Sequence, residues 1–108
     1  MNEPLRVLII DDSERDALLL VRALRKEGLE LYSERIDTAE TMERAVTARI
    51  WDVAISDCHM PDFTVEGAMA IWQKEGKDQP FIVVSGAIGE EEAVSLLKAG
   101  AHDFVKKD

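Results

Sequence analysis

Short apolar segments alternate with amphipathic segments along the whole chain. The apolar segments are rich in Val and Ile, which is typical of strands that are buried on both faces. Between them, apolar residues recur at three- and four-residue spacing, as on one face of a helix. We expect strands at residues 7–10, 29–36, 53–56, 81–84 and 103–106. We expect helices from residue 14 to the glycine at 28, around 39–46, and over 66–74 and 90–99.

Local signals indicate where these helices begin and end. Ser13 is suited to cap the first helix, and Gly28 is suited to end it. Asp37 and Glu40 resemble a capping pair for the second helix. The strand expected at 29–36 is the most polar of the five, which favours a position near the sheet edge.

Five strands that alternate with four helices indicate an α/β fold. Right-handed crossovers make the sheet parallel, and helices on both faces make it doubly wound. Strand order 2-1-3-4-5, as in flavodoxin-like folds, is the common solution at this size. The working groups of such a sheet lie just beyond the carboxyl ends of its strands. We therefore expect one domain over residues 1–108, with its chemistry at that edge.

Composition narrows the classes of partner. The chain has 108 residues, 13 basic and 22 acidic, and a formal net charge of −9. This charge argues against binding to a nucleic acid backbone or an anionic membrane. Cys58 is the single cysteine, so no internal disulfide can form. Together with the lack of a signal peptide or a membrane-length apolar run, this favours a cytoplasmic location.

Three carboxylates follow the two strands that we expect to be neighbours. Asp11 and Asp12 end the first strand, and Asp57 ends the third. Like charges repel at short range, and a hard divalent cation relieves that repulsion. Oxygen ligands favour Mg²⁺ or Mn²⁺, and the sequence offers no Cys–His cluster for zinc.

A second group of polar residues follows the fourth and fifth strands. Ser85, the amide of Gly86 and either Lys106 or Lys107 form a suitable cradle for a tetrahedral anion. Asp57 is then a candidate nucleophile that becomes an acyl phosphate. Each feature alone has an ordinary explanation as a helix cap, a turn or a surface charge. Their joint occurrence at four strand ends favours a phosphoryl site.

Four motifs resemble one known family. They are VLIIDD at 7–12, SDCHMP at 56–61, VVSG at 83–86 and GAHDFVKKD at 100–108. Together they resemble the receiver domain of two-component response regulators, over nearly the whole chain. The resemblance implies that Asp57 is the phosphoacceptor. It also implies that Asp12 binds the metal directly, Asp11 binds it mainly through water, and the His59 carbonyl is a further ligand.

The resemblance also assigns the residues on the last two strands. It favours Lys107 over Lys106 as the phosphoryl-binding lysine, with the Gly86 amide as a further contact. Ser85 and Phe104 fill the two switch positions. Drawing Ser85 toward the phosphoryl group lets Phe104 turn inward, which switches the face formed by the fourth helix and fifth strand.

The implied function is to take a phosphoryl group from the phosphohistidine of a sensor histidine kinase or phosphotransfer protein. The reaction is Mg²⁺-dependent, and the isolated chain catalyses only its own phosphorylation and hydrolysis. One alternative is a receiver-like protein-binding module that is never phosphorylated. Another is a small metal-dependent phosphatase. A homodimer is a further alternative to a monomer.

Other residues have ordinary expected roles or depart from the family pattern. Cys58, Trp51 and Trp72 are expected to pack, and His102 is expected at the surface. Asp108 replaces the usual proline. The ending resembles receivers joined to PAS domains, histidine kinases or other output domains, so an output domain after position 108 is expected. The final helix of the family is expected to be missing from this sequence, which leaves an exposed apolar strip.

Overall fold

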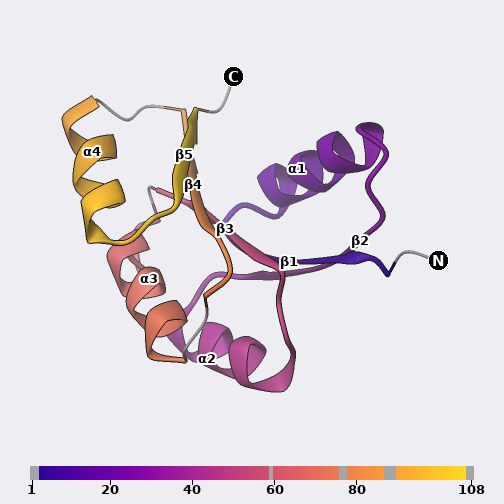
Figure 1. Ribbon diagram of the computed structural model, residues 1–108, viewed down its shortest axis with the longest axis horizontal. Helices are drawn as coiled ribbons and strands as arrows, with labels where there is room; N and C mark the ends of the chain where they lie inside the picture. The colour runs from indigo at the N-terminus through magenta and orange to yellow at the C-terminus, as the bar shows by residue number, and fades with distance from the viewer. Residues whose placement is uncertain (1–2, 59, 76–77, 87–89, 107–108) are drawn as a thin grey trace.

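The chain folds into a five-stranded sheet flanked by four helices (Figure 1). The computed structural model describes residues 3–58, 60–75, 78–86 and 90–106. The strands are β1 Leu5–Ile10, β2 Leu31–Ile36, β3 Val53–Asp57, β4 Phe81–Ser85 and β5 Asp103–Lys106. The helices are α1 Glu14–Lys26, α2 Ala39–Ala48, α3 Val65–Lys74 and α4 Glu90–Ala99.

The sheet is parallel throughout, with strand order β2-β1-β3-β4-β5. This confirms the predicted topology, including the edge position of the polar second strand. β1 and β3 lie side by side in the interior of the sheet, so their carboxyl ends open at the same edge. The strand order therefore brings residues 11–12 close to residue 57.

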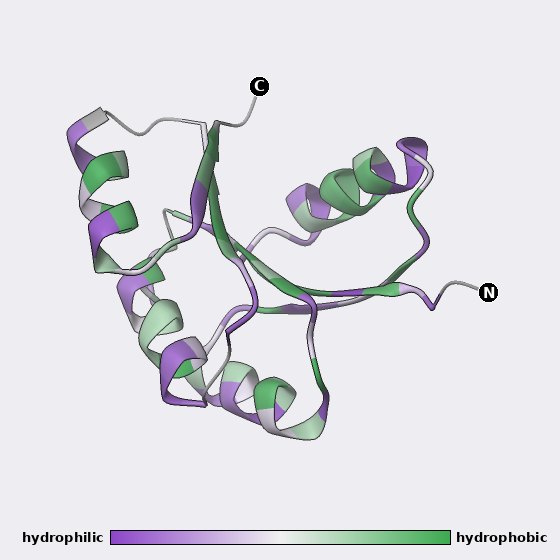
Figure 2. Cartoon of the chain, in the orientation of Figure 1, coloured by the Kyte–Doolittle hydropathy of each residue, from purple (hydrophilic) through white to green (hydrophobic). Residues whose placement is uncertain are grey.

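Helices cover both faces of the sheet unequally. α1 packs alone on one face, whereas α2, α3 and α4 pack on the other (Figure 1). The green and purple sides of the helices in Figure 2 show their amphipathic character. Residues 7–10 of β1 are at most 2% exposed, because this strand is covered on both faces. That burial explains why the segment is an unbroken apolar run.

Two tryptophans anchor the core on the side of α2, α3 and α4. Trp51 is fully buried, and its indole N–H donates to the Ala45 carbonyl at 2.9 Å. Trp72 is also buried and donates to the Gln79 carbonyl at 3.0 Å. Both contacts confirm the predicted packing roles, and they satisfy the indole N–H that burial would otherwise leave unpaired.

The ends of α1 confirm the local signals. The Ser13 hydroxyl accepts a hydrogen bond from the Asp16 amide at 3.1 Å. Gly28 has a φ of +92°, a conformation that glycine adopts at little cost. The Leu29 amide still donates to the Leu24 carbonyl, at 3.3 Å. For this reason β2 begins at Leu31, later than the sequence predicted.

The predicted cap of α2 is wrong. The Thr38 hydroxyl accepts from the Thr41 amide at 3.1 Å, and the Thr41 hydroxyl accepts from the Thr38 amide at 3.3 Å. The two threonines thus form a reciprocal capping box. Asp37 lies one residue too early to cap, and its carboxylate pairs with Arg35 at 3.5 Å.

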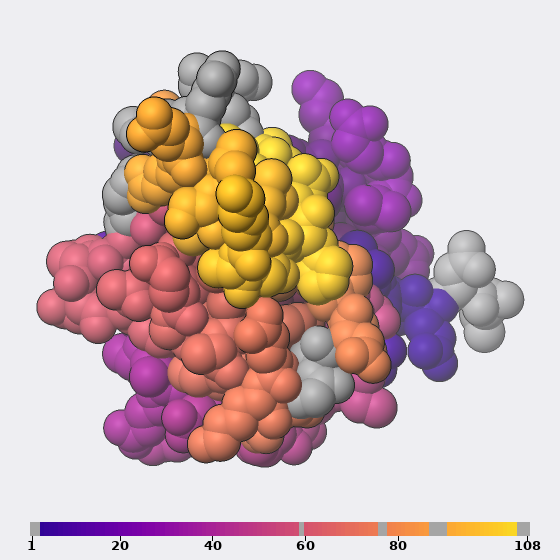
Figure 3. Space-filling model, turned by 60° about the vertical axis from the view of Figure 1, so that its left-hand side comes forward, coloured from indigo at the N-terminus to yellow at the C-terminus, as the bar shows by residue number. Residues whose placement is uncertain are grey.

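The face of β4 and β5 on the side of α1 presents apolar side chains. Val105 of β5 lies opposite Val84 of β4 and is 46% exposed. Val84 and Ile82 are only partly buried against the α1-side core. Figure 3 shows α4 and β5 in yellow beside α3.

In the described ranges, no helix combines the length and apolarity needed to cross a bilayer.

Candidate functional site

Three carboxylates converge at the carboxyl edge of the sheet. Asp11 and Asp12 follow β1, and Asp57 ends β3, the strand paired with β1. One oxygen from each side chain lies within 4.8 Å of the others. Asp11 is 4% exposed, Asp57 is half-buried and Asp12 is exposed. The predicted convergence of the three carboxylates is confirmed.

The main chain and the start of α1 hold Asp11 in place. Its amide donates to the Ile36 carbonyl at 3.0 Å, which continues the pairing of β1 with β2. Its carboxylate oxygen Oδ1 accepts from the Ser13 amide at 2.8 Å. The same turn therefore fixes a carboxylate of the cluster and begins the helix that Ser13 caps.

The donor set of this cluster suits a hard divalent cation. It consists of carboxylate oxygens, two of them on side chains that solvent reaches. Three negative charges at this spacing repel one another, and a bound cation would offset the repulsion. Mg²⁺ typically takes one or two carboxylates and keeps several waters. The exposed side of the cluster at Asp12 leaves room for such waters.

Ser85 lies beside the end of β3. The register pairs Asp57 with Val84, and the Cys58 amide donates to the Val84 carbonyl at 3.2 Å. Ser85 is therefore one residue further along the neighbouring strand, and it is 1% exposed. Gly86, which follows it, is exposed. The serine and the glycine thus flank the same edge as the carboxylates.

Phe104 lies on β5, opposite Val83 of β4. Its ring is partly buried against the core beneath α2, α3 and α4. Two other predicted site residues, His59 and Lys107, lie outside the described residues. The structure therefore brings together the carboxylates and Ser85, and it places Phe104 one strand away from Ser85.

Cys58 connects the end of β3 to α4. Its side chain is 8% exposed, and its thiol donates to Oε1 of Glu92 at 3.6 Å. Burial, followed by the nearby Glu92 carboxylate, raises the pKa of the Cys58 thiol to about 11. A neutral, buried thiol is a poor nucleophile, in keeping with the predicted packing role. Sequence reasoning missed Glu92, because nothing distinguishes it from the two glutamates before it.

The raised pKa of Cys58 predicts a loss of stability at alkaline pH. The unfolded thiol ionises near pH 9, whereas the folded thiol stays protonated to about pH 11. Its contribution is fully present below pH 9 and is lost as the pH rises toward 11. This rise in the pKa of the thiol corresponds to about 3 kcal/mol.

This prediction is checked by urea unfolding of the wild type and Cys58→Ala between pH 8.5 and 10.5. The wild type should lose stability relative to the variant across this window, because alanine does not titrate. Parallel stability curves for the two proteins would show that the thiol is not protected from ionisation.

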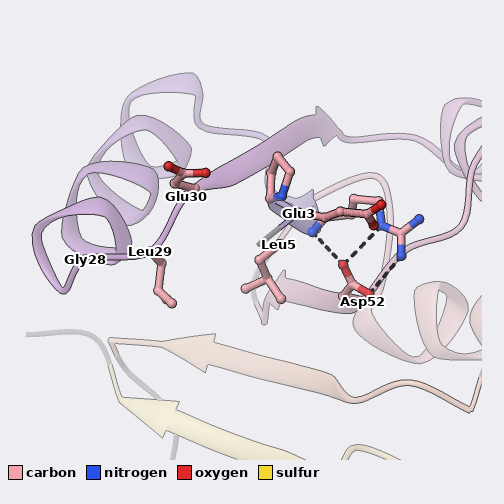
Figure 4. A pocket seen from close by; sticks show the side chains of 8 residues that line it. Glu3, Leu5, Gly28, Leu29, Glu30 and Asp52 are labelled. Atoms are coloured by element: carbon pink, nitrogen blue, oxygen red, sulfur yellow. Dashed lines mark hydrogen bonds and ion pairs between the residues drawn. The ribbon is translucent and has the colours of Figure 1, made fainter. Parts of the chain in front are cut away.

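A pocket of about 690 Å³ lies at the opposite end of the sheet (Figure 4). Its wall includes an ion pair in which the Asp52 carboxylate accepts from the Arg6 amide at 2.8 Å and from the guanidinium at 3.1 Å. These bonds lower the pKa of Asp52. The pocket flanks the start of β1, a full strand length from Asp11. It therefore contributes nothing to the carboxylate cluster.

The chain is similar to known proteins over nearly its whole length. The model of the response regulator receiver domain family matches residues 7–108. The transcriptional regulatory protein PrrA of Mycobacterium leprae is 32% identical over 102 residues, which are 94% of this chain and 43% of that protein. A protein-glutamate methylesterase/protein-glutamine glutaminase of Archaeoglobus fulgidus is 30% identical over 95% of this chain and 30% of its own length. The chain thus spans less than half of these curated relatives.

Solved structures agree with this comparison. The signal receiver domain of NarL from Mycobacterium tuberculosis has a TM-score of 0.82 at 25% identity, covering 99% of this chain and 86% of that one. The beryllofluoride-activated NtrC4 receiver domain dimer has a TM-score of 0.81 at 27% identity, covering 95% and 84%. Both are therefore similar to this chain in overall fold.

Proposed function

The chain belongs to the response regulator receiver domain family of two-component signalling, and on that premise we propose that Asp57 accepts a phosphoryl group. The observation that carries this proposal is the convergence of Asp57 with Asp11 and Asp12 at the carboxyl edge. A carboxylate oxygen of Asp57 attacks the phosphorus of a phosphohistidine. The phosphorus–nitrogen bond breaks, and its electron pair returns to the imidazole nitrogen.

The neighbouring residues hold the reacting groups. We assign Asp12 and Asp57 as direct ligands of Mg²⁺, Asp11 as a ligand mainly through water, and the His59 carbonyl as a further ligand. When bound, the cation neutralises charge on the phosphoryl oxygens. Lys107, Ser85 and the Gly86 amide are assigned to the remaining oxygens. Buried Ser85 beside β3 supports its part in this arrangement.

Phosphorylation is proposed to switch the face formed by α4 and β5. Ser85 moves toward the phosphoryl group, and the partly buried ring of Phe104 then turns further inward. Ser85 ends β4, and Phe104 lies on β5. Because these two strands are paired, a movement of Ser85 can affect the position of Phe104, which supports the proposed coupling. The Cys58–Glu92 contact adds a direct link from the end of β3 to α4.

The proposed partners follow from the family. Receiver domains interact with histidine kinases or phosphotransfer proteins, and we propose such a phosphodonor for this chain. We also propose a cytoplasmic location, an output domain after Asp108, and the absence of direct nucleic acid or membrane binding by this acidic domain. A homodimer of the activated form is supported by the NtrC4 receiver, which was solved as a dimer.

Acetyl phosphate with MgCl₂ tests the function without a partner kinase. Intact-mass measurement should show one added phosphoryl group on the wild type and none on Asp57→Asn. Asp62→Asn is a matched control, because it removes an exposed carboxylate from the loop that follows β3. Chelation of Mg²⁺ should prevent the modification. An unmodified wild type would favour the protein-binding module, and turnover of small phosphoesters would favour the phosphatase.

A further inference from the structure

Arg35, near the end of β2, bonds the main chain of Asp11, a residue of the carboxylate cluster, from a strand that supplies none of the carboxylates. The register places Arg35 opposite Ile9, two residues before Asp11. Its guanidinium donates to the main-chain carbonyl of Asp11 at 3.2 Å and also pairs with Asp37 at 3.5 Å. The arginine side chain is 32% exposed, so solvent screens its charge only in part.

The guanidinium is close enough to change the potential at the cluster. The guanidinium nitrogen is 3.2 Å from the main-chain carbonyl of Asp11, which also carries a carboxylate of the cluster, so the positive charge lies within a Debye length of about 10 Å. A guanidinium stays protonated throughout the pH range in which proteins are folded. It therefore attracts the three carboxylates when no cation is bound, and it repels a cation that binds among them.

The position of Asp11 does not depend on this arginine alone. The Asp11 amide donates to the Ile36 carbonyl, and its carboxylate accepts from the Ser13 amide. These two bonds keep the carboxylate in place when the Arg35 contact is removed. Replacing Arg35 should therefore change the affinity of the cluster for a cation mainly through the lost positive charge, and less through the lost hydrogen bond.

We propose that Arg35 is an electrostatic tuning residue that stabilises the metal-free cluster and lowers its affinity for a divalent cation. This inference rests on the proposed metal site and deepens it. The arginine compensates the repulsion among Asp11, Asp12 and Asp57 in the metal-free state. Its charge competes with the cation once the site is filled, so the domain binds the ion less tightly than its three carboxylates alone would allow.

The test measures Mg²⁺ binding directly, with MgCl₂ alone as the probe. Backbone amide NMR shifts of residues 12 and 13 give the dissociation constant for the wild type and Arg35→Gln. The variant should bind Mg²⁺ roughly three- to tenfold more tightly at about 0.1 M ionic strength. The difference should shrink at higher salt, because the Debye length shortens.

Two variants separate the local charge from other effects. Arg35→Lys keeps the charge and should bind Mg²⁺ nearly as the wild type does. Arg25→Gln removes the same charge from the last turn of α1, roughly 18 Å along the helix from Ser13, and should leave the affinity for Mg²⁺ unchanged. Urea unfolding with EDTA should show Arg35→Gln to be less stable than Arg25→Gln.

Each outcome decides a different question. If the wild type shows no saturable Mg²⁺ binding, both the proposed metal site and the tuning role are overturned. If the wild type binds Mg²⁺ and Arg35→Gln binds it equally or more weakly, only the tuning role fails. A merely structural arginine would lower stability with and without Mg²⁺ alike, and its loss would not tighten binding.

Discussion

Replacing Asp12 with asparagine is expected to stabilise the metal-free domain and, at the same time, to weaken Mg²⁺ binding by roughly 100-fold. Asp12 is exposed, and its carboxylate lies within 4.8 Å of those of Asp11 and Asp57. Removing one of three like charges at that spacing relieves about 1 kcal/mol of repulsion. The same change removes a proposed direct ligand, so the stabilisation that a bound cation provides should largely disappear.

Urea unfolding with EDTA and with millimolar MgCl₂ measures both effects on one protein. Glu14→Gln is the matched control, because it removes an exposed carboxylate from the adjacent first turn of α1. The control should keep the Mg²⁺-dependent gain in stability. A metal-free Asp12→Asn that is less stable than the wild type would contradict the repulsion argument. An unchanged gain with Mg²⁺ would remove Asp12 from the ligand set.

Replacing Trp72 with alanine is expected to lower the free energy of unfolding by about 3–5 kcal/mol. Trp72 is 1% exposed and packs edge-on against Phe81, with ring centroids 6.2 Å apart. Its indole N–H also donates to the Gln79 carbonyl. The truncation leaves a cavity between α3 and β4 and an unpaired carbonyl. Since domains of this size are stable by only about 5–15 kcal/mol, the variant should lose much of its stability.

Two control variants bracket this effect in urea unfolding at 25 °C. Trp72→Phe keeps an aromatic ring but loses the hydrogen bond, and should cost about 1–2 kcal/mol. Ile50→Ala truncates a side chain that is 62% exposed, and should cost less than about 0.5 kcal/mol. Equal losses for Trp72→Ala and Ile50→Ala would show that the indole is not part of a close-packed core.

The strands and their order were predictable because each core strand is apolar on both faces. That pattern excludes a solvent-facing antiparallel sheet and requires helical crossovers. Once the order is known, Asp11, Asp12 and Asp57 must meet, because β1 and β3 are neighbours. The carboxylate cluster is therefore a consequence of topology, and topology is encoded in the alternation of segments.

Features that depend on tertiary contacts were not predictable in the same way. The capping box of α2 uses Thr38 and Thr41, whereas Asp37 two residues after Arg35 forms an ion pair instead. Which of several polar residues caps a helix depends on where its first turn closes, and short-range sequence signals leave that uncertain by a residue. The Arg35 contact to Asp11 spans 24 positions, so only the register of β1 with β2 reveals it.

The strand order also determines which parts of the domain unfold locally at the lowest free-energy cost. Asp11 and Asp57 emerge from β1 and β3, which are paired on both sides, whereas Phe104 belongs to β5 at the sheet edge. A strand with one neighbour detaches at a lower free-energy cost than an interior strand. Local opening at β5 would therefore leave the carboxylate cluster assembled. The domain can thus change shape at this edge of the sheet while the three carboxylates stay together.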